Sequence, residues 1–337
     1  MVKYILKRLV YVVVVFVILS FLMFFLYNLT PGDPVRDMLE PQKDKMTPEE
    51  YRIEYERLTA QLGLDKPMVV QYWKWFTNLL QGDFGYSSYY RDAVVNHLAG
   101  PVQNTLFLNI VTTILALGIT IPLGIKCAIK KNSLLDKSTQ VVTIVGISIP
   151  IYITALVFIY FFAILLGIFP PGGIKTPGSQ YVGMRAFTDK LYYMSLPIIV
   201  ATFNSLGSTF RYVRAAMITE LSQDYIRTAR AKGVREKVVI YSHAWRNALL
   251  PIITILISWF TTLLSGWAIL EQMFLLQGVG QIMILGLNNK DYQLVLAMQM
   301  VFVVISLVSR LITDLSYGLV DPVSYTHLRA HETRRHL

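Results

Sequence analysis

Apolar runs of about 20 residues recur along this 337-residue chain, and they constrain its fold more than any other feature. Inside a bilayer, backbone N–H and C=O groups have no water to bind, so a run of this length predicts a transmembrane helix. The composition agrees, with 54% hydrophobic residues and a mean hydropathy of +0.48. The sequence therefore predicts an all-α polytopic membrane protein.

Six segments are candidates for membrane spans. They cover about residues 9–29, 102–127, 138–166, 191–210, 249–270 and 293–319. Pro122 and Pro150 fall inside the second and third segments, where each proline is expected to kink or interrupt the helix. A cleaved signal peptide is the alternative for the first segment, but that run is too long for a signal core and has no small-x-small cleavage motif.

The charges of the connecting segments indicate an orientation. Residues 30–100 hold eight Lys/Arg and eleven Asp/Glu, whereas residues 220–251 hold six Lys/Arg and three Asp/Glu. Loops rich in Lys and Arg stay on the cytoplasmic side of a membrane. The pattern predicts that the long polar insert is external and that both termini are cytoplasmic.

The polar interval 220–251 has features beyond its charge. Residues 221–232 contain no Gly or Pro and are predicted to form a short helix, which Gly233 can end in a left-handed conformation. Four apolar residues then recur at spacings of four, three and four, which predicts a second helix with one apolar face. These residues are Val234, Val238, Tyr241 and Trp245. A solvated basic loop that only orients the chain is the alternative, but it requires none of these features.

The motif RTARAKG, which ends at Gly233, and the later RNALLP together resemble the cytoplasmic signature loop of ABC-importer permease subunits. The longer forms DYIRTARAKG and HAWRNALLP are similar to those of the dipeptide, oligopeptide and nickel permease family. The commonest signature has Glu-Ala-Ala where this chain has Arg-Thr-Ala, and the spacing from Gly233 to Pro251 is longer than in sugar permeases. Both departures fit the peptide branch. The resemblance covers about residues 1–322 and includes PGDP and LGLDKP in the insert.

The resemblance implies a fold and a set of partners. The fold is that of type I ABC-importer permeases, with six transmembrane helices, a long external insert after the first helix and a cytoplasmic coupling helix. The implied partners are a second homologous permease subunit, two ATP-binding ABC subunits, an extracellular or periplasmic solute-binding protein and the lipid of a bacterial inner membrane. ATP and Mg²⁺ would be bound by the ATPase subunits, so no cofactor is expected in this chain.

The same resemblance places the coupling loop at residues 216–248. Its ATPase-coupling segment comprises Asp224, Tyr225, Ile226, Arg227, Thr228, Ala229, Arg230, Ala231, Lys232 and Gly233. Ile226 and Ala229 are three residues apart and share a helical face, so these two side chains and Tyr225 are expected to face the ATPase. The two arginines of the segment are expected at the rim of that contact.

A polar cargo needs polar surface inside the membrane, because a peptide backbone cannot cross bare hydrocarbon. Polar residues cluster in the fourth predicted span, and we expect them to line the pathway. They are Asn204, Ser205, Ser208 and Thr209.

The chain is predicted to have four parts: a cytoplasmic end and first helix (1–29), the external insert (30–100), a five-helix permease core (101–322) and a tail (323–337). The tail holds three of the five histidines, which could suggest a metal-binding segment. Its string SYTHLRAHET, however, matches the translation of a transposon-type sequencing adapter. We therefore interpret the tail as non-native and exclude it from the fold prediction.

Other chemistries lack their motifs. The sequence has no G-x-x-x-x-G-K-[ST] loop, no H-E-x-x-H and no second cysteine beside Cys127. It therefore predicts a transport subunit and not an enzyme, with no catalytic residue and no metal site. The net charge of +10 is concentrated in loops beside apolar runs, a pattern typical of membrane topology and not of nucleic-acid binding.

The cargo stays open at this stage. A peptide is the first expectation, and a nickel chelate or another small solute carried by the same family is the alternative. An ion-coupled secondary transporter would require intramembrane ionisable residues and inverted repeats, neither of which is evident. A membrane anchor or receptor for a cytoplasmic complex is a further alternative, which an uptake measurement would separate from a transporter.

Overall fold

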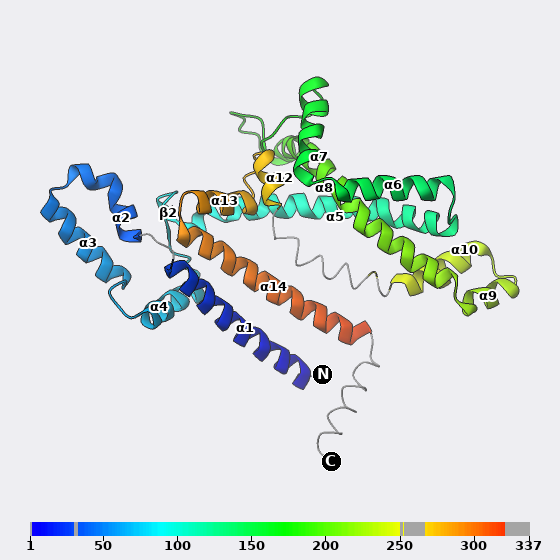
Figure 1. Cartoon of the computed structure of the whole chain (residues 1–337), viewed down its shortest axis with the longest axis horizontal. Coiled ribbons are helices and arrows are strands. Elements are labelled where there is room, and N and C mark those ends of the chain that lie inside the picture. The colour runs from blue at the N-terminus through cyan, green and yellow to red at the C-terminus, as the bar shows by residue number, and fades with distance from the viewer. Residues whose placement is uncertain (1, 30–32, 250–251, 253–266, 321–337) are drawn as a thin grey trace, which may run out of the picture. The chain divides into compact units, whose positions relative to one another are not determined.

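The computed structural model describes residues 2–29, 33–249, 252 and 267–320 of the chain. Helices account for nearly all of its regular structure (Figure 1). The chain divides into two compact units. The first unit draws its described residues from Met1–Val102 and Ile282–Val308, and the second from Gln103–Gln281 and Ser309–Leu337.

The first unit combines the N-terminal helix, the polar insert and the beginning of the C-terminal helix. Its elements are α1 (Val2–Asn28), α2 (Pro34–Leu39), η1 (Glu40–Lys45), α3 (Pro48–Leu62), α4 (Met68–Leu80), β1 (Tyr86–Ser87), β2 (Asp92–Ala93), η2 (Val94–His97) and the adjoining parts of α13 (Val279–Asn288) and α14 (Tyr292–Val320). Its buried core joins α1, α4 and α14 through Phe24, Tyr72, Phe76, Leu296 and Met300. The amphipathic α4 thus packs its aromatic face on the two long helices instead of standing free.

Local sequence explains where α3 begins and ends. Thr47 accepts a hydrogen bond from the Glu50 backbone N–H, and the Glu50 carboxylate accepts one from the Thr47 N–H, a reciprocal capping box. Gly63 follows the last turn in the left-handed region at φ 77°. Residues next to α3 in the sequence therefore set both of its ends.

A short antiparallel pair closes the insert onto the start of α14. Tyr86 pairs with Ala93 across β1 and β2. The carboxylate of Asp291, only 1% exposed, accepts a hydrogen bond from the Ser87 hydroxyl at 2.5 Å and also caps α14 through the Leu294 N–H at 3.1 Å. One buried acid thus ties the insert to a helix that lies about 200 residues later.

The second unit contains the remaining helices. They are most of α5 (Ala99–Ile129), α6 (Leu134–Ser148), α7 (Ile151–Phe158), the π-helical η3 (Ile159–Leu165), α8 (Gly183–Leu221), α9 (Asp224–Ala231), α10 (Glu236–Val238), the π-helical η4 (Val239–Ala244) and α12 (Ala268–Met273). Helices α6 and α8 pack closely at Gly207, where an added Cβ would overlap the Ile147 side chain. Small residues at such contacts let helix backbones approach each other.

Three described helices are long and apolar enough to cross a membrane: Ile5–Asn28, Val94–Ile129 and Tyr292–Thr313. They coincide with the first, second and sixth predicted spans. The second continues through Pro122 as one helix, and the kink expected there stays a prediction. The fourth predicted span lies inside α8, and the fifth falls almost wholly outside the described residues. The structure thus confirms an all-α protein with several apolar helices, while the number six stays a prediction.

The third predicted span is broken at Pro150. Helices Leu134–Ser148 and Ile151–Leu165 are bent by 104°, and the pair counts as a fourth candidate span if it crosses as one unit. Proline disfavours a helical conformation for the residue before it. Ile149 accordingly adopts an extended backbone, φ −82° and ψ 124°. The predicted interruption is confirmed, and it is a sharp corner instead of a gentle kink.

Candidate functional site

The predicted coupling segment forms the short helix α9, which ends as its sequence predicts. After the helix, Gly233 adopts φ +73°, a left-handed conformation that costs glycine little. The Gly233 N–H donates to the Arg230 carbonyl at 3.0 Å, and the Val234 N–H donates to the Ala229 carbonyl at 3.2 Å. These bonds satisfy carbonyls at the helix end, so the glycine turn sets where the following segment starts.

One face of α9 is buried in this chain's own core. Ile226 is fully buried, and Ala229 packs beside it against the same cluster. This cluster, here called the loop core, contains Ile125, Ala128, Val213, Met217, Ile226, Val239, Ile240, Ala244, Ala248 and Ile252. The prediction that Ile226 faces a partner is wrong, because α5, α8 and η4 already cover it, whereas Ala229 is only half-buried and its contact with a partner stays a prediction.

The opposite face of α9 is exposed. Asp224, Arg227, Thr228 and Ala231 follow the i, i+3, i+4, i+7 pattern of one helical face, and all four are exposed. Arg227 and Asp224 form a surface ion pair at 3.3 Å. Beside this face, the Tyr225 hydroxyl donates a hydrogen bond to Glu220. The residues that α9 presents to a partner are therefore polar or small.

An ion pair closes the turn after α9. The Arg230 guanidinium contacts the Glu236 carboxylate through two hydrogen bonds, Nη2 to Oε1 at 2.6 Å and Nε to Oε2 at 3.1 Å. The guanidinium lowers the pKa of Glu236 below its ordinary value. Arg230 thus bridges the turn within the chain instead of standing free at a rim.

The segment after the turn is helical, but its buried face differs from the prediction. Val238 and Tyr241 are exposed, whereas Val239, Ile240 and Ala244 point into the loop core. Residues Val239–Ala244 form the π-helical turn η4, which does not keep the regular α-helical period on which the prediction rests. The predicted apolar face assumed a regular α-helical period, and the prediction is wrong for Val238 and Tyr241.

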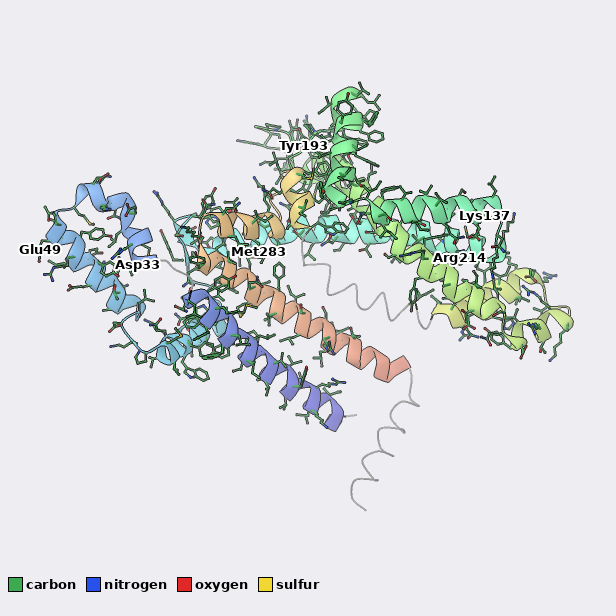
Figure 2. All side chains as sticks on the ribbon, viewed as in Figure 1. Asp33, Glu49, Lys137, Tyr193, Arg214 and Met283 are labelled. Carbon is green, nitrogen blue, oxygen red and sulfur yellow. The ribbon has the colours of Figure 1, made fainter. Side chains whose placement is uncertain are left out.

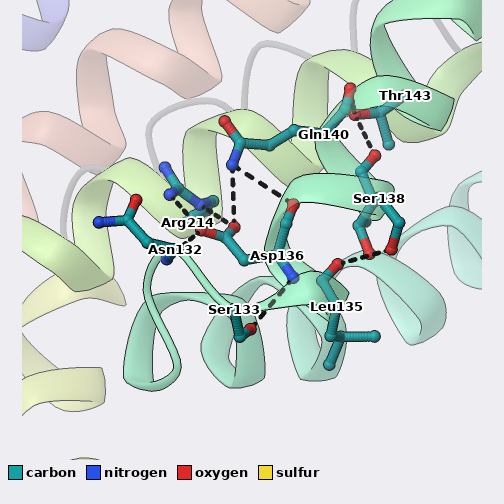
Figure 3. A network of polar contacts seen from close by, with 9 residues as sticks. Asn132, Ser133, Leu135, Asp136, Ser138, Gln140, Thr143 and Arg214 are labelled. Atoms are coloured by element: carbon teal, nitrogen blue, oxygen red, sulfur yellow. Dashed lines mark hydrogen bonds and ion pairs between the residues drawn. The ribbon is translucent and has the colours of Figure 1, made fainter.

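A buried ion pair lies on the helix that leads into α9. Arg214 of α8 (labelled in Figure 2) contacts Asp136 of α6 with two parallel bonds, at 2.5 and 2.7 Å (Figure 3). Asp136 is 0% exposed and also accepts bonds from the Asn132 N–H and the Gln140 amide. Sequence reasoning missed this pair, because the two residues are 78 positions apart. An acid at the start of an apolar helix was the available signal.

A second buried carboxylate was also missed. Glu271 is 0% exposed and accepts bonds from the Thr105 hydroxyl at 2.7 Å and from the Gly280 and Gln281 N–H groups at 2.7 and 3.1 Å. These N–H groups form the start of α13, where a negative charge is favoured by the helix dipole. Thr105 in turn accepts the Val279 N–H at 2.9 Å. Glu271 follows directly after the fifth predicted span, and both of its carboxylate oxygens accept hydrogen bonds inside the protein.

The four predicted pathway residues do not form one open polar face. Asn204 donates to the Gly146 carbonyl at 3.4 Å, and the hydroxyls of Ser205, Ser208 and Thr209 bond to carbonyls of α8 itself. Thr209 is buried, whereas Ser208 is exposed. Their role in a pathway stays a prediction. Within the described ranges, no three His, Cys, Asp or Glu side chains are grouped as metal ligands would be.

Comparison with known proteins gives the family. Residues 120–323 match the family model for the binding-protein-dependent transport system inner membrane component, and residues 1–108 match its N-terminal family model. The chain is 35% identical over 323 residues to a putative peptide permease protein of Brucella suis biovar 1, covering 96% of this chain and 98% of the relative. It is 34% identical to the oligopeptide transport system permease protein AppB of Bacillus subtilis strain 168, over 96% and 99% of the two chains. It is 30% identical to the glutathione transport system permease protein GsiC of Escherichia coli strain K12, over 96% and 98%.

The two family models together match residues of both units. Helix α9 and its glycine turn lie within residues 120–323, which match the first of these models. The family is a transport component that works with ABC-transporter partners such as a binding protein and ATPases. The chain belongs to the family of binding-protein-dependent transport system inner membrane components and is a multi-pass permease subunit of an ABC importer.

Proposed function

We propose that the chain forms half of a translocation pathway for peptides, together with a second homologous permease subunit. The printed names of the relatives, which are peptide, oligopeptide and glutathione permeases, support a peptide cargo. Two ATPase subunits bind on the cytoplasmic side and hold ATP and Mg²⁺, while a solute-binding protein delivers cargo from outside. The chain crosses the membrane six times with both termini in the cytoplasm.

The observation that carries this proposal is the construction of α9. Its exposed polar face is available to another protein, while Ile226 on the opposite face is anchored in a core shared with α5 and α8. A movement imposed on the exposed face is therefore transmitted to the long helices through packed side chains. ATP drives transport only if its binding favours one conformation of the complex over the other. Helix α9 is the element through which the ATPases shift the long helices between these conformations.

The buried acids favour this function over an ion-coupled transporter. Asp136 is paired with Arg214, and Glu271 is bound by backbone N–H groups and a hydroxyl. A site that binds and releases ions needs a carboxylate that is free to exchange its partners. Both carboxylates instead serve as connections between helices.

The test is peptide uptake by the four-subunit complex reconstituted into liposomes with its binding protein. We expect ATP-dependent accumulation of a labelled peptide, which stops when the ATPase subunits are omitted. Accumulation that persists without ATPases, or that follows an ion gradient, contradicts the proposal.

Orientation is tested by labelling single cysteines introduced into the Cys127→Ala background. A cysteine at Tyr51 should react in intact cells, and one at Lys237 only after permeabilisation. The reverse result contradicts the proposed topology.

A further inference from the structure

The first unit encloses a cavity of about 520 Å³ that the proposed function does not use. It lies between α1, α4, the residues around β1 and the start of α14. This volume falls within the range of about 300–1,000 Å³ that small-molecule sites occupy. All of the described lining residues belong to the first unit.

The cavity has an apolar floor and a polar rim. Phe24 and Leu296 are buried at its base, and Trp75 is a half-buried wall residue. Lys290 and Asp83 line it and are exposed, so the cavity presents both signs of charge to solvent. A ligand that carries a cation, an anion and an apolar group matches this arrangement.

Several polar groups of the lining have no partner within the part of the chain that the structure describes. The Gln293 Oε1 is buried and accepts no hydrogen bond. The Lys290 ammonium and the Asn78 side-chain amide also lack partners among the described residues. One Asp83 carboxylate oxygen accepts the Gly85 N–H at 2.9 Å, and the other is not engaged. Buried polar atoms without partners are rare, so the Gln293 Oε1 is the group of this lining that most favours a ligand with a hydrogen-bond donor.

The unpaired groups match a peptide with free ends. A peptide bond offers one N–H and one C=O, which amide side chains such as Asn78 and Gln293 can satisfy. A terminal carboxylate would bind Lys290 through a charge-assisted hydrogen bond, and a terminal ammonium would bind Asp83. The Trp75 ring supplies apolar surface for a side chain.

We propose that this cavity is a binding site for a short peptide with free termini, held on the external side of the permease. The proposal rests on the proposed peptide-import function and adds to it a site in the insert. Lys290 binds the carboxylate end, and Gln293 binds an amide at the floor.

The experiment measures peptide binding by titration calorimetry on the complete importer in nanodiscs without its binding protein. The probes are the tripeptide Ala-Phe-Ala and its C-terminally amidated form. We expect Lys290→Met to weaken binding of the free-carboxylate peptide by about tenfold or more. The same substitution should leave binding of the amidated peptide unchanged, because that peptide has no carboxylate to lose.

The matched control is Lys66→Met. Lys66 is exposed, pairs with Asp65 at 3.0 Å and does not line the cavity, so its loss should not change the affinity for either peptide. Gln293→Met, which keeps the side-chain size but removes the amide, should weaken binding of both peptides. The melting temperature of each variant complex is also measured. A melting temperature equal to that of the wild type shows that the substitution acts on the binding site and not on folding.

The proposal is overturned if the complex shows no saturable binding of either peptide. It is also overturned if Lys290→Met and Lys66→Met have equal affinities for the free-carboxylate peptide. Peptide uptake is measured on the same preparation, so that failure of the cavity site can be distinguished from failure of the peptide-import function. Uptake without binding at the cavity rejects the site alone, whereas absence of peptide uptake rejects the peptide-import function.

Discussion

Arg214 on α8 holds the buried carboxylate of Asp136 on α6 in a bidentate ion pair, with Nε–Oδ1 and Nη2–Oδ2 distances of 2.5 and 2.7 Å (Figure 3). Helix α8 ends at Leu221, three positions before α9 begins. The pair therefore fixes α6 to the part of α8 that carries the exposed helix. Planar guanidinium geometry suits two parallel bonds, which lysine cannot make.

Arg214→Ala should destabilise the protein by about 3 kcal/mol, because it leaves a buried charge without its partner. The expected loss is at the lower end of the range for buried pairs, since Arg214 keeps 17% side-chain exposure. Arg214→Lys should keep only part of the stability that Arg214→Ala loses. Thermal melting of the detergent-purified permease complex is the measurement. Arg211→Ala, an exposed arginine on the same helix, is the control, and equal melting of the two alanine variants would contradict the role of the pair.

Gly278→Ala should disturb the start of α13. A methyl group at Gly278 would overlap the Glu271 carboxylate, which has no room to move because three donors hold it. Overpacking of this kind costs about 1–3 kcal/mol. Gly100→Ala is the control, since no atom lies within 4 Å of an added Cβ there. The melting temperatures of both variants are measured in the same detergent. A Gly278→Ala variant that melts at the wild-type temperature would show that the Glu271 carboxylate can shift.

Ala231→Trp and Ala229→Trp should separate the two faces of α9. Ala231 is exposed, so a large side chain there should displace the ATPase subunits while the permease melts normally. Ala229 packs on the loop core, so its replacement should lower the melting temperature as well. Co-purification of ATPases with the tagged permease is measured together with melting. Full ATPase retention by Ala231→Trp would show that the exposed face does not bind them.

Gly233→Val should uncouple ATP hydrolysis from transport without preventing membrane insertion. A left-handed conformation costs an L-residue about 1–2 kcal/mol, and a β-branched residue more. No atom lies near an added Cβ, so the penalty comes from the backbone alone. Gly233→Asn is the control, since asparagine tolerates this conformation. We expect peptide-stimulated ATPase activity to fall in the valine variant and to persist with asparagine. Normal stimulation in both would exclude the turn from coupling.

Features that depend on neighbouring residues could be predicted from the sequence. The length of the apolar runs predicts the long helices α1, α5 and α14, because a backbone in lipid must satisfy its own hydrogen bonds. Pro150 predicts the break between α6 and α7 through the geometry of its own ring. Gly233 predicts the end of α9, because a left-handed turn strains any residue with a Cβ.

Features that depend on contacts between distant residues were decided only by the tertiary structure. Periodicity shows that Ile226 and Ala229 share a face of α9, but it does not show whether the same chain or another protein covers that face. The pairing of Asp136 with Arg214 depends on two helices meeting, as does the bond between Glu271 and Thr105. A buried charge is stable only when such a partner is present. The spacing of residues along the chain determines helical faces, whereas packing in three dimensions determines what each face contacts.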